Sequence, residues 1–119
     1  MSSATNSLGI LVISHGSPRA EANQGFVGMV GRVAARLGSD AVLPAFFSIA
    51  RPNIADQVAV LYGRGLRHIV LMPYFLYSGQ HVTVDIPALL EECRSQFPEL
   101  VLEQLPTLEN DPSVEDVVV

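Results

Sequence analysis

The sequence predicts an α/β fold in which helices cover a parallel sheet of four strands. Four short apolar segments alternate with segments of helical periodicity, and glycine or proline marks most of the boundaries between them. The first and third apolar segments contain almost no polar residue, which is typical of parallel strands buried on both faces. A chain of 119 residues has the length of one domain, which we expect to span residues 1–119.

Strands that alternate with helices imply a sheet built by right-handed crossovers. The expected elements are, in chain order, a strand at Leu8–Ser14, a helix at Ala20–Leu37, a strand at Ala41–Ile49, a helix from Pro52 to Tyr62, a strand within Arg67–Tyr77, a helix from Pro87 to Phe97, a strand at Glu99–Leu105 and a last helix that starts at Asn110–Pro112.

The first helix is supported by apolar residues at helical spacing from Phe26 to Leu37, and Gly38 supplies its C-terminal stop. It also carries Gly25, Gly28 and Gly31, each of which costs about 1 kcal/mol relative to alanine in a helix interior. Either close packing against a neighbour offsets this cost or the helix is locally weak. The sequence leaves both interpretations open.

The second and fourth strands are expected at the edges of the sheet. Pro44 lies inside the second strand and cannot donate a ladder hydrogen bond. Glu103 and Gln104 make the fourth strand more polar than the first and third. With the first and third strands central, the strand order is 2-1-3-4. The switch point then lies between the first and third strands, and ligands of open α/β sheets bind outside the carboxyl ends of the strands at such a point.

An apolar stripe from Ile54 to Tyr62 supports the second helix, and one from Ile86 to Phe97 supports the third. Cys93 falls in the latter stripe and is expected to be a buried core thiol. Because it is the single cysteine, an internal disulfide and a CxxC-type zinc cluster are excluded. Asp85 precedes the third helix and is interpreted as its cap; a direct acid–base role is the alternative.

The composition excludes several classes of function. Hydrophobic residues make up 49% and charged residues 16% of the chain, which argues against disorder. The formal charge is −5 and the basic residues form no run, so neither nucleic acid nor an anionic membrane is expected as a partner. No segment has the length and apolarity of a membrane span, and the N-terminus lacks the basic and apolar regions of a signal. We therefore expect a cytoplasmic protein.

Two histidines stand where the expected site lies. His15 follows the first strand in S-H-G-S-P, and His81 follows the third strand and the Ser78–Gly79 turn, so His81 is expected in a loop. Two imidazoles at the same ends of two buried strands suit a metal or catalytic site, whereas a closed structural zinc site takes four ligands. We therefore predict that His15 and His81 take up a metal and release it. His68 enters the third strand at the opposite end and is interpreted as structural.

Other interpretations of these loops are weaker. Ser14 and Ser17 flank His15, but a hydrolase would need the G-x-S-x-G elbow, and neighbours in sequence seldom adopt triad geometry. The H-G-S-P loop also lacks the G-x-G-x-x-G fingerprint of dinucleotide binding. Arg19 and Arg51 each follow a strand on the site side. Either they are solvated surface residues or they recognise carboxylates, and the sequence leaves both open.

Taken together, these residues resemble the small CbiX-type sirohydrochlorin chelatases, which are class II chelatases. The resemblance covers residues 8–118 and rests on LVISHGSPR with Asn23, on FFSIARPNI at 46–54 and on PYFLYSGQHVTVDIP at 73–87. It implies the flavodoxin-like half of a chelatase fold, paired as a homodimer. One departure stands out: the family usually has glutamate where this chain has Ser48, and Arg51 stands where an acidic residue is common.

The resemblance implies insertion of Co²⁺ or Fe²⁺ into sirohydrochlorin, for cobalamin or sirohaem, with His15 and His81 as the catalytic and metal-binding residues. The residues expected to bind the tetrapyrrole are Arg19, Ser48, Arg51, Ser78 and Gly79. The metal is then a substrate, and no organic cofactor is implied. Because serine is uncharged at neutral pH and a poor base, the alternative is a catalytically weak tetrapyrrole- or metal-binding module. A domain that serves only as an assembly partner is a third possibility, and the choice among cobalt, iron and nickel stays open.

Overall fold

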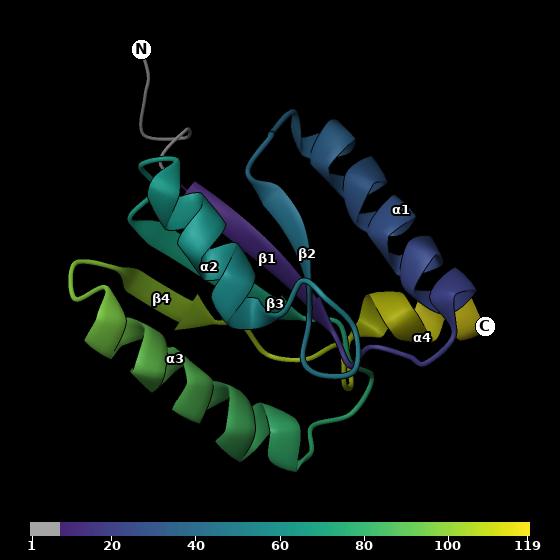
Figure 1. The fold of residues 1–119 in the computed structure, drawn as a ribbon. Helices are drawn as coiled ribbons and strands as arrows, with labels where there is room; N and C mark the ends of the chain where they lie inside the picture. Colours follow the sequence, from purple (N-terminus) through teal and green to yellow (C-terminus); the bar gives the residue numbers. More distant parts are fainter. Residues whose placement is uncertain (1–7) are drawn as a thin grey trace.

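The computed structural model describes residues 8–119 apart from the side chain of His81, and Figure 1 shows the fold. The elements are, in chain order, β1 (Leu8–Ser14), α1 (Ala20–Leu37), β2 (Val42–Phe46), α2 (Ile54–Gly63), β3 (His68–Pro73), a π-helical turn η2 (His81–Asp85), α3 (Ile86–Gln96), β4 (Val101–Gln104) and α4 (Pro112–Val118). The predicted α/β architecture is confirmed.

The described residues form a sheet of four parallel strands in the order β2-β1-β3-β4, as predicted. β1 is central, because Ile13 pairs with Ala45 of β2 and with Pro73 of β3. Pro44 lies in the edge strand β2, where a missing ladder donor is tolerated. Glu103 lies in β4 at the other edge. The proline in β2 and the polar residues in β4 were therefore enough to order the sheet.

Helices cover both faces of the sheet. Successive strand residues point to opposite sides, so two neighbouring residues of β1 show what packs on each face. Val12 of β1 packs with Phe26 of α1 in one buried cluster. Its neighbour Leu11 belongs to the larger cluster on the other face, with Val58 of α2 and Leu90 of α3. Figure 1 shows α2 lying over the strands on the near side. The fold is thus a three-layer arrangement whose two cores meet at the central strands.

β2 ends earlier than predicted, and β3 occupies only the first part of the range Arg67–Tyr77 in which it was predicted. β2 stops at Phe46 because the following loop bends sharply: Ile49 has a φ of 74°, which an extended strand does not adopt. β3 stops at Pro73 because its neighbours end near the same level, β1 at Ser14 and β4 at Gln104. The apolar residues beyond Pro73 therefore form a loop, and this loop reaches the predicted site.

The segment before α3 is helical, not a loop as predicted. Asp85 lies inside it, with φ −72° and ψ −44°, and its side chain makes no capping hydrogen bond. Its predicted role as a cap is wrong because helical bonding starts earlier, at Gly79. The carbonyl of Gly79 accepts the backbone N–H of Val82 at 3.1 Å and that of Thr83 at 3.0 Å. The same finding moves His81 from a loop to the first position of a π-helical turn.

The glycines of α1 face open space. A Cβ at Gly25 or Gly31 would meet nothing within 4 Å, and one at Gly28 would meet only the Arg32 guanidinium, at 3.5 Å. Close packing among the described residues therefore does not offset the propensity cost of these glycines. The other interpretation, local weakness of the helix, stays a prediction.

The expectation that Cys93 is a buried core thiol is met. Cys93 is buried in α3, and burial raises the pKa of its thiol above the usual 9.0, so the thiol is neutral and shielded at physiological pH. None of the described helices combines the length and the apolarity needed to cross a bilayer.

Candidate functional site

The loops that follow β1 and β3 start side by side at the carboxyl end of the sheet. The two strands are adjacent and parallel, and their pairing continues one step further, because the backbone N–H of Tyr74 donates to the carbonyl of Ile13 at 2.8 Å. The segment that begins with His15 and the segment 74–80 therefore leave the sheet together. This is the carboxyl end of the strands at the switch point, where the site was predicted.

The imidazole of His15 lies against an aromatic ring of the core. The two rings of His15 and Phe75 stack with centroids 4.1 Å apart and an interplanar angle of 12°. His15 is exposed, whereas Phe75 is only 6% exposed and shares a core cluster with Val82. Stacking on a packed ring fixes the plane of the imidazole while the residue stays accessible from outside. A group that receives a ligand and passes it on needs both properties.

Gly16 allows the loop after β2 to approach His15 closely. It has a φ of 92°, and a Cβ at this position would lie 2.0 Å from the carbonyl oxygen of Ser48. The backbone N–H of Phe47 donates to Ser14 at 2.7 Å, and that of Ser48 donates to the carbonyl of His15 at 3.1 Å. Main-chain contacts thus place the Ser48 backbone beside His15, and tetrapyrrole binding by Ser48 stays a prediction.

The structure assigns His81 a backbone position but not a side-chain position, because that side chain lies outside the described residues. The next residue, Val82, is buried in the core cluster that contains Phe75. The segments that carry the two histidines therefore pack on shared core residues. Among the side chains that the structure describes, no three His, Cys, Asp or Glu residues lie close enough to hold a metal ion. The pairing of His15 with His81 remains a prediction.

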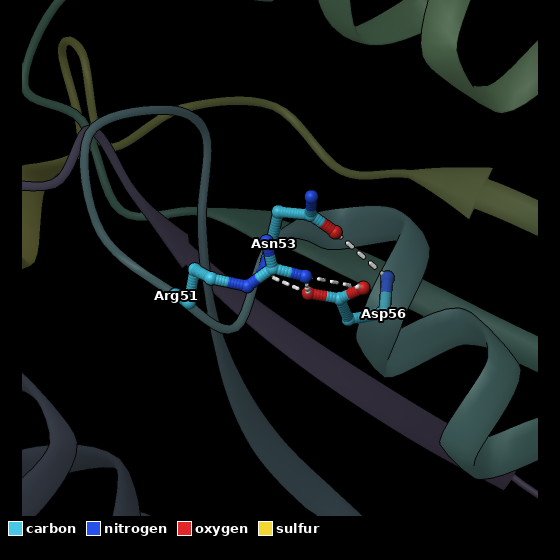
Figure 2. A network of polar contacts seen from close by, with 3 residues as sticks. All are labelled: Arg51, Asn53 and Asp56. Carbon is cyan, nitrogen blue, oxygen red and sulfur yellow. Dashed lines mark hydrogen bonds and ion pairs between the residues drawn. The ribbon is translucent and has the colours of Figure 1, made fainter.

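The two arginines of the predicted site differ in how closely they are paired with a carboxylate. Figure 2 shows that Arg51 lies against the N-terminal capping box of α2. Its guanidinium is 3.1 Å from the Asp56 carboxylate, which also accepts the backbone N–H of Asn53 at 3.2 Å. Among the described side chains, the Arg19 guanidinium is paired with Glu21 at 3.9 Å, and both side chains are more than three-quarters exposed. Such an exposed pair contributes little, so Arg19 is the more available of the two for a carboxylate ligand.

Ser78 makes its described hydrogen bonds to the segment after β4. Its backbone N–H donates to Glu109 Oε1 at 3.0 Å, and its hydroxyl lies 3.2 Å from that of Thr107. An open pocket of about 490 Å³ lies alongside. It is lined by Ser78, Val82, Pro87, Gln104, Leu105, Pro106, Thr107 and Glu109. Substrate binding by Ser78 and Gly79 therefore stays a prediction, made about groups that already have partners in this structure.

His68 lies at the opposite end of β3, as expected. It pairs with Leu8 and Val101 in the sheet, and its ring contacts the carboxylate of Glu103 across β4. Two contributors to the site were not predicted, namely Phe75 and the segment 104–109. Their contacts join residues far apart in sequence, so no local pattern marks them. The glycine after His15 was the one local signal of a close backbone approach.

A model of the CbiX family matches residues 9–119 of the chain. The chain is 33% identical over 89 residues to a chloroplastic sirohydrochlorin ferrochelatase of Arabidopsis thaliana, and the match spans 75% of this chain and 40% of the relative. It is 38% identical over 87 residues to a sirohydrochlorin cobaltochelatase of Methanosarcina acetivorans, spanning 72% of this chain and 66% of the relative. The chain thus spans two thirds or less of the length of these relatives.

Solved structures share the fold at lower identity. A CbiX protein from Marinobacter aquaeolei superposes with a TM-score of 0.80 at 22% identity, covering 93% of each chain. The sirohydrochlorin chelatase SirB from Bacillus subtilis, in complex with cobalt, superposes with a TM-score of 0.88 at 22% identity. That match covers 94% of this chain and 48% of SirB, so the present fold corresponds to about half of the longer chain. The family resemblance predicted from the three motifs is confirmed by these comparisons.

Proposed function

Because the chain belongs to the CbiX family, we propose that it inserts Co²⁺ or Fe²⁺ into sirohydrochlorin. The observation that carries this proposal is the family match over nearly the whole described chain, with His15 at the carboxyl edge of β1. Relatives named as a ferrochelatase and a cobaltochelatase support both metals. These relatives are longer than this chain, so the activity comes to it as a proposal.

The chemistry requires an exchange of two protons for one divalent ion. The macrocycle loses two pyrrole N–H protons, four ring nitrogens bind the metal, and the ion loses its earlier ligands. Neutral imidazole is a good ligand for Co²⁺ or Fe²⁺. In our proposal His15, oriented by stacking on Phe75, and His81 hold the ion until ring nitrogens displace them. Released imidazole can then accept a pyrrole proton and pass it to water.

The surrounding residues fit recognition of a flat ligand with carboxylates at its edge. Arg19 has only a weak partner in Glu21, so we propose that it binds a peripheral carboxylate. Arg51 would have to exchange its contact with Asp56 for the same role. Ser48 lies beside the His15 backbone and would contribute a hydrogen bond, as would Ser78 and Gly79. No organic cofactor enters this scheme, and the cytoplasmic location expected from the composition remains part of the proposal.

We further propose that the active form is a homodimer. The carboxyl end of a single sheet offers only one wall to a ligand that needs burial on several sides. A largely apolar surface lies beside the 74–80 loop, around a groove of about 310 Å³ lined by Tyr74, Leu76, Leu108, Val114 and Val117. Exposed apolar surfaces of this kind mark contact sites. We favour a second copy as the occupant, since this chain matches about half of SirB and a second copy would supply a comparable amount of structure.

The homodimer is tested by Val117→Arg, with Val60→Arg as a control on the exposed side of α2. Both positions are exposed, so neither substitution disturbs the core. Light scattering should show a dimer for the wild type and for Val60→Arg, and a monomer with reduced insertion for Val117→Arg. A wild-type monomer with full insertion activity would contradict this part of the proposal.

The activity itself is tested by anaerobic absorbance of sirohydrochlorin with Co²⁺ or Fe²⁺. His15→Ala should abolish most insertion without unfolding the protein, since His15 is exposed. His68→Ala is the matched control, because His68 lies at the other end of the sheet. Loss of activity in His68→Ala but not in His15→Ala would refute the site. A protein that binds the ring or the metal without turnover would instead support the alternative of a weak binding module, which Ser48 favours.

A further inference from the structure

We propose that the segment Gln104–Glu109, which begins at the last residue of β4, positions the two histidine-bearing segments, and that Gln104 is its principal positioning residue. The inference rests on the proposed metal site at His15 and His81. It adds residues that do not touch the metal but determine whether the two imidazole-bearing segments stay in place. The structure supports it through hydrogen bonds that reach the 75–82 stretch at three points.

The first point is next to His81. Gln104, the last residue of β4, donates from its side-chain amide to the carbonyl of Val82 at 2.9 Å. Val82 directly follows His81 in η2 and is 8% exposed. Gln104 is itself half-buried, so this hydrogen bond is sheltered from water and worth more than an exposed one. It ties the first turn of the helical segment to the edge strand of the sheet.

The other two points lie upstream of His81. The backbone N–H of Ser78 donates to Glu109 at 3.0 Å, and the Ser78 hydroxyl contacts that of Thr107 at 3.2 Å. The backbone N–H of Leu108 donates to the carbonyl of Phe75 at 2.9 Å. The ring of Phe75 is the surface on which His15 stacks. One segment therefore contacts the neighbour of His81, the turn before it and the residue that orients His15.

These hydrogen bonds matter because the stretch between them has little packing of its own. Leu76 and Tyr77 are 54% and 77% exposed, so among the described side chains the loop contributes few buried ones apart from Phe75. Its shape then depends on polar contacts with the 104–109 segment. Two imidazoles can share one ion only if their positions hold to about 0.5 Å. Loosening the segment should therefore weaken metal binding before it unfolds the protein.

The test compares Gln104→Met with Gln57→Met. Methionine keeps the length of the side chain and removes the donor in both. Gln57 is a matched control because its amide donates to the carbonyl of Pro44 at 2.8 Å, within β2 and not to the 75–82 stretch. Thermal unfolding and Co²⁺ titration of the full chain are measured on each variant. We expect both to melt at a lower temperature, and only Gln104→Met to bind Co²⁺ at least tenfold more weakly. Equal Co²⁺ affinities in the two variants would overturn the inference.

A second pair of variants keeps the inference testable even if Gln104→Met fails to fold. Glu109→Gln retains an acceptor oxygen for the Ser78 N–H, whereas Glu109→Ala does not. We expect weaker Co²⁺ binding in Glu109→Ala and near-normal binding in Glu109→Gln; the same affinity in both would contradict the inference.

His15→Ala, titrated alongside, separates the two levels of the proposal. If His15→Ala loses Co²⁺ binding while Gln104→Met and Glu109→Ala retain it, only the positioning role is wrong. If His15→Ala binds as the wild type does, the metal site itself is wrong and the positioning role falls with it.

Discussion

Replacing Gly16 with alanine should destabilise the protein, because Gly16 lies where the loop after β1 contacts the loop after β2. Two effects add at this position. Its φ of 92° is one that an L-residue seldom adopts, and the new Cβ would lie 2.0 Å from the carbonyl oxygen of Ser48. The left-handed conformation costs about 1–2 kcal/mol, and relief of the overlap costs about 1–3 kcal/mol more. The expected total is therefore about 2–5 kcal/mol.

Gly65→Ala provides the control, because the chain offers the same backbone conformation without the neighbour. Gly65 also has a φ of 92°, but a Cβ there would meet nothing within 4 Å. Only the conformational cost of about 1–2 kcal/mol applies. Urea denaturation should therefore show a larger loss for Gly16→Ala, and its Co²⁺ affinity should fall as the Ser48 loop moves away from His15. Equal losses of stability in the two variants would refute the close approach of these loops.

Three further predictions concern Glu99, Ile49 and Ser48. The pKa of Glu99 is lowered from 4.5, first by its own backbone N–H and then by the Tyr62 hydroxyl, which donates to it at 2.8 Å. The carboxylate therefore stabilises the fold above its unfolded-state pKa, and this contribution is lost as pH falls through the lower folded-state value. Glu99→Gln should thus destabilise the protein at neutral pH and flatten its acid denaturation profile, whereas a profile like that of the wild type would contradict the assignment. Ile49 has a φ of 74° and is 70% exposed, so Ile49→Gly should raise the free energy of unfolding by about 1 kcal/mol; a lower value would show that the side chain packs. Ser48→Glu should raise cobalt insertion on the order of 10²-fold if a base is missing at this position, and unchanged turnover would show that another group serves.

The strand order could be predicted because edges impose chemical demands that single residues reveal. Pro44 cannot donate to a ladder, and it lies in edge strand β2. Glu103 marks β4 by placing a charge on a strand that has one neighbour in the described sheet. The central strands needed no such residue, since their near-continuous apolar runs already indicated burial on both faces.

The start of the helical segment at His81 could not be predicted from its own residues. The run H-V-T-V-D contains three β-branched residues, which disfavour helix through restricted χ1 rotation. Tertiary packing overrides this preference, because the helical turn buries Val82 in the core and brings its carbonyl within 2.9 Å of the Gln104 amide. The core residues that pack on Val82 and the Gln104 amide both lie outside the short stretch of sequence from which a helix is predicted. The stacking of His15 on Phe75 escaped prediction for the same reason, since it joins residues from two separate loops.

Two properties of the site meet at position 48: the placement of His15 and the supply of a base for proton transfer. The loop that carries it is fixed by main-chain hydrogen bonds, from Phe47 to Ser14 and from Ser48 to His15, and by the space that Gly16 leaves open. None of these contacts involves the side chain at position 48, so exchange of glutamate for serine leaves the placement of His15 intact. A base at this position would act only on the proton transfer that accompanies insertion. Loss of that base should therefore slow turnover while metal binding persists, and the ratio of these two effects in Ser48→Glu distinguishes a slow chelatase from a module that only binds.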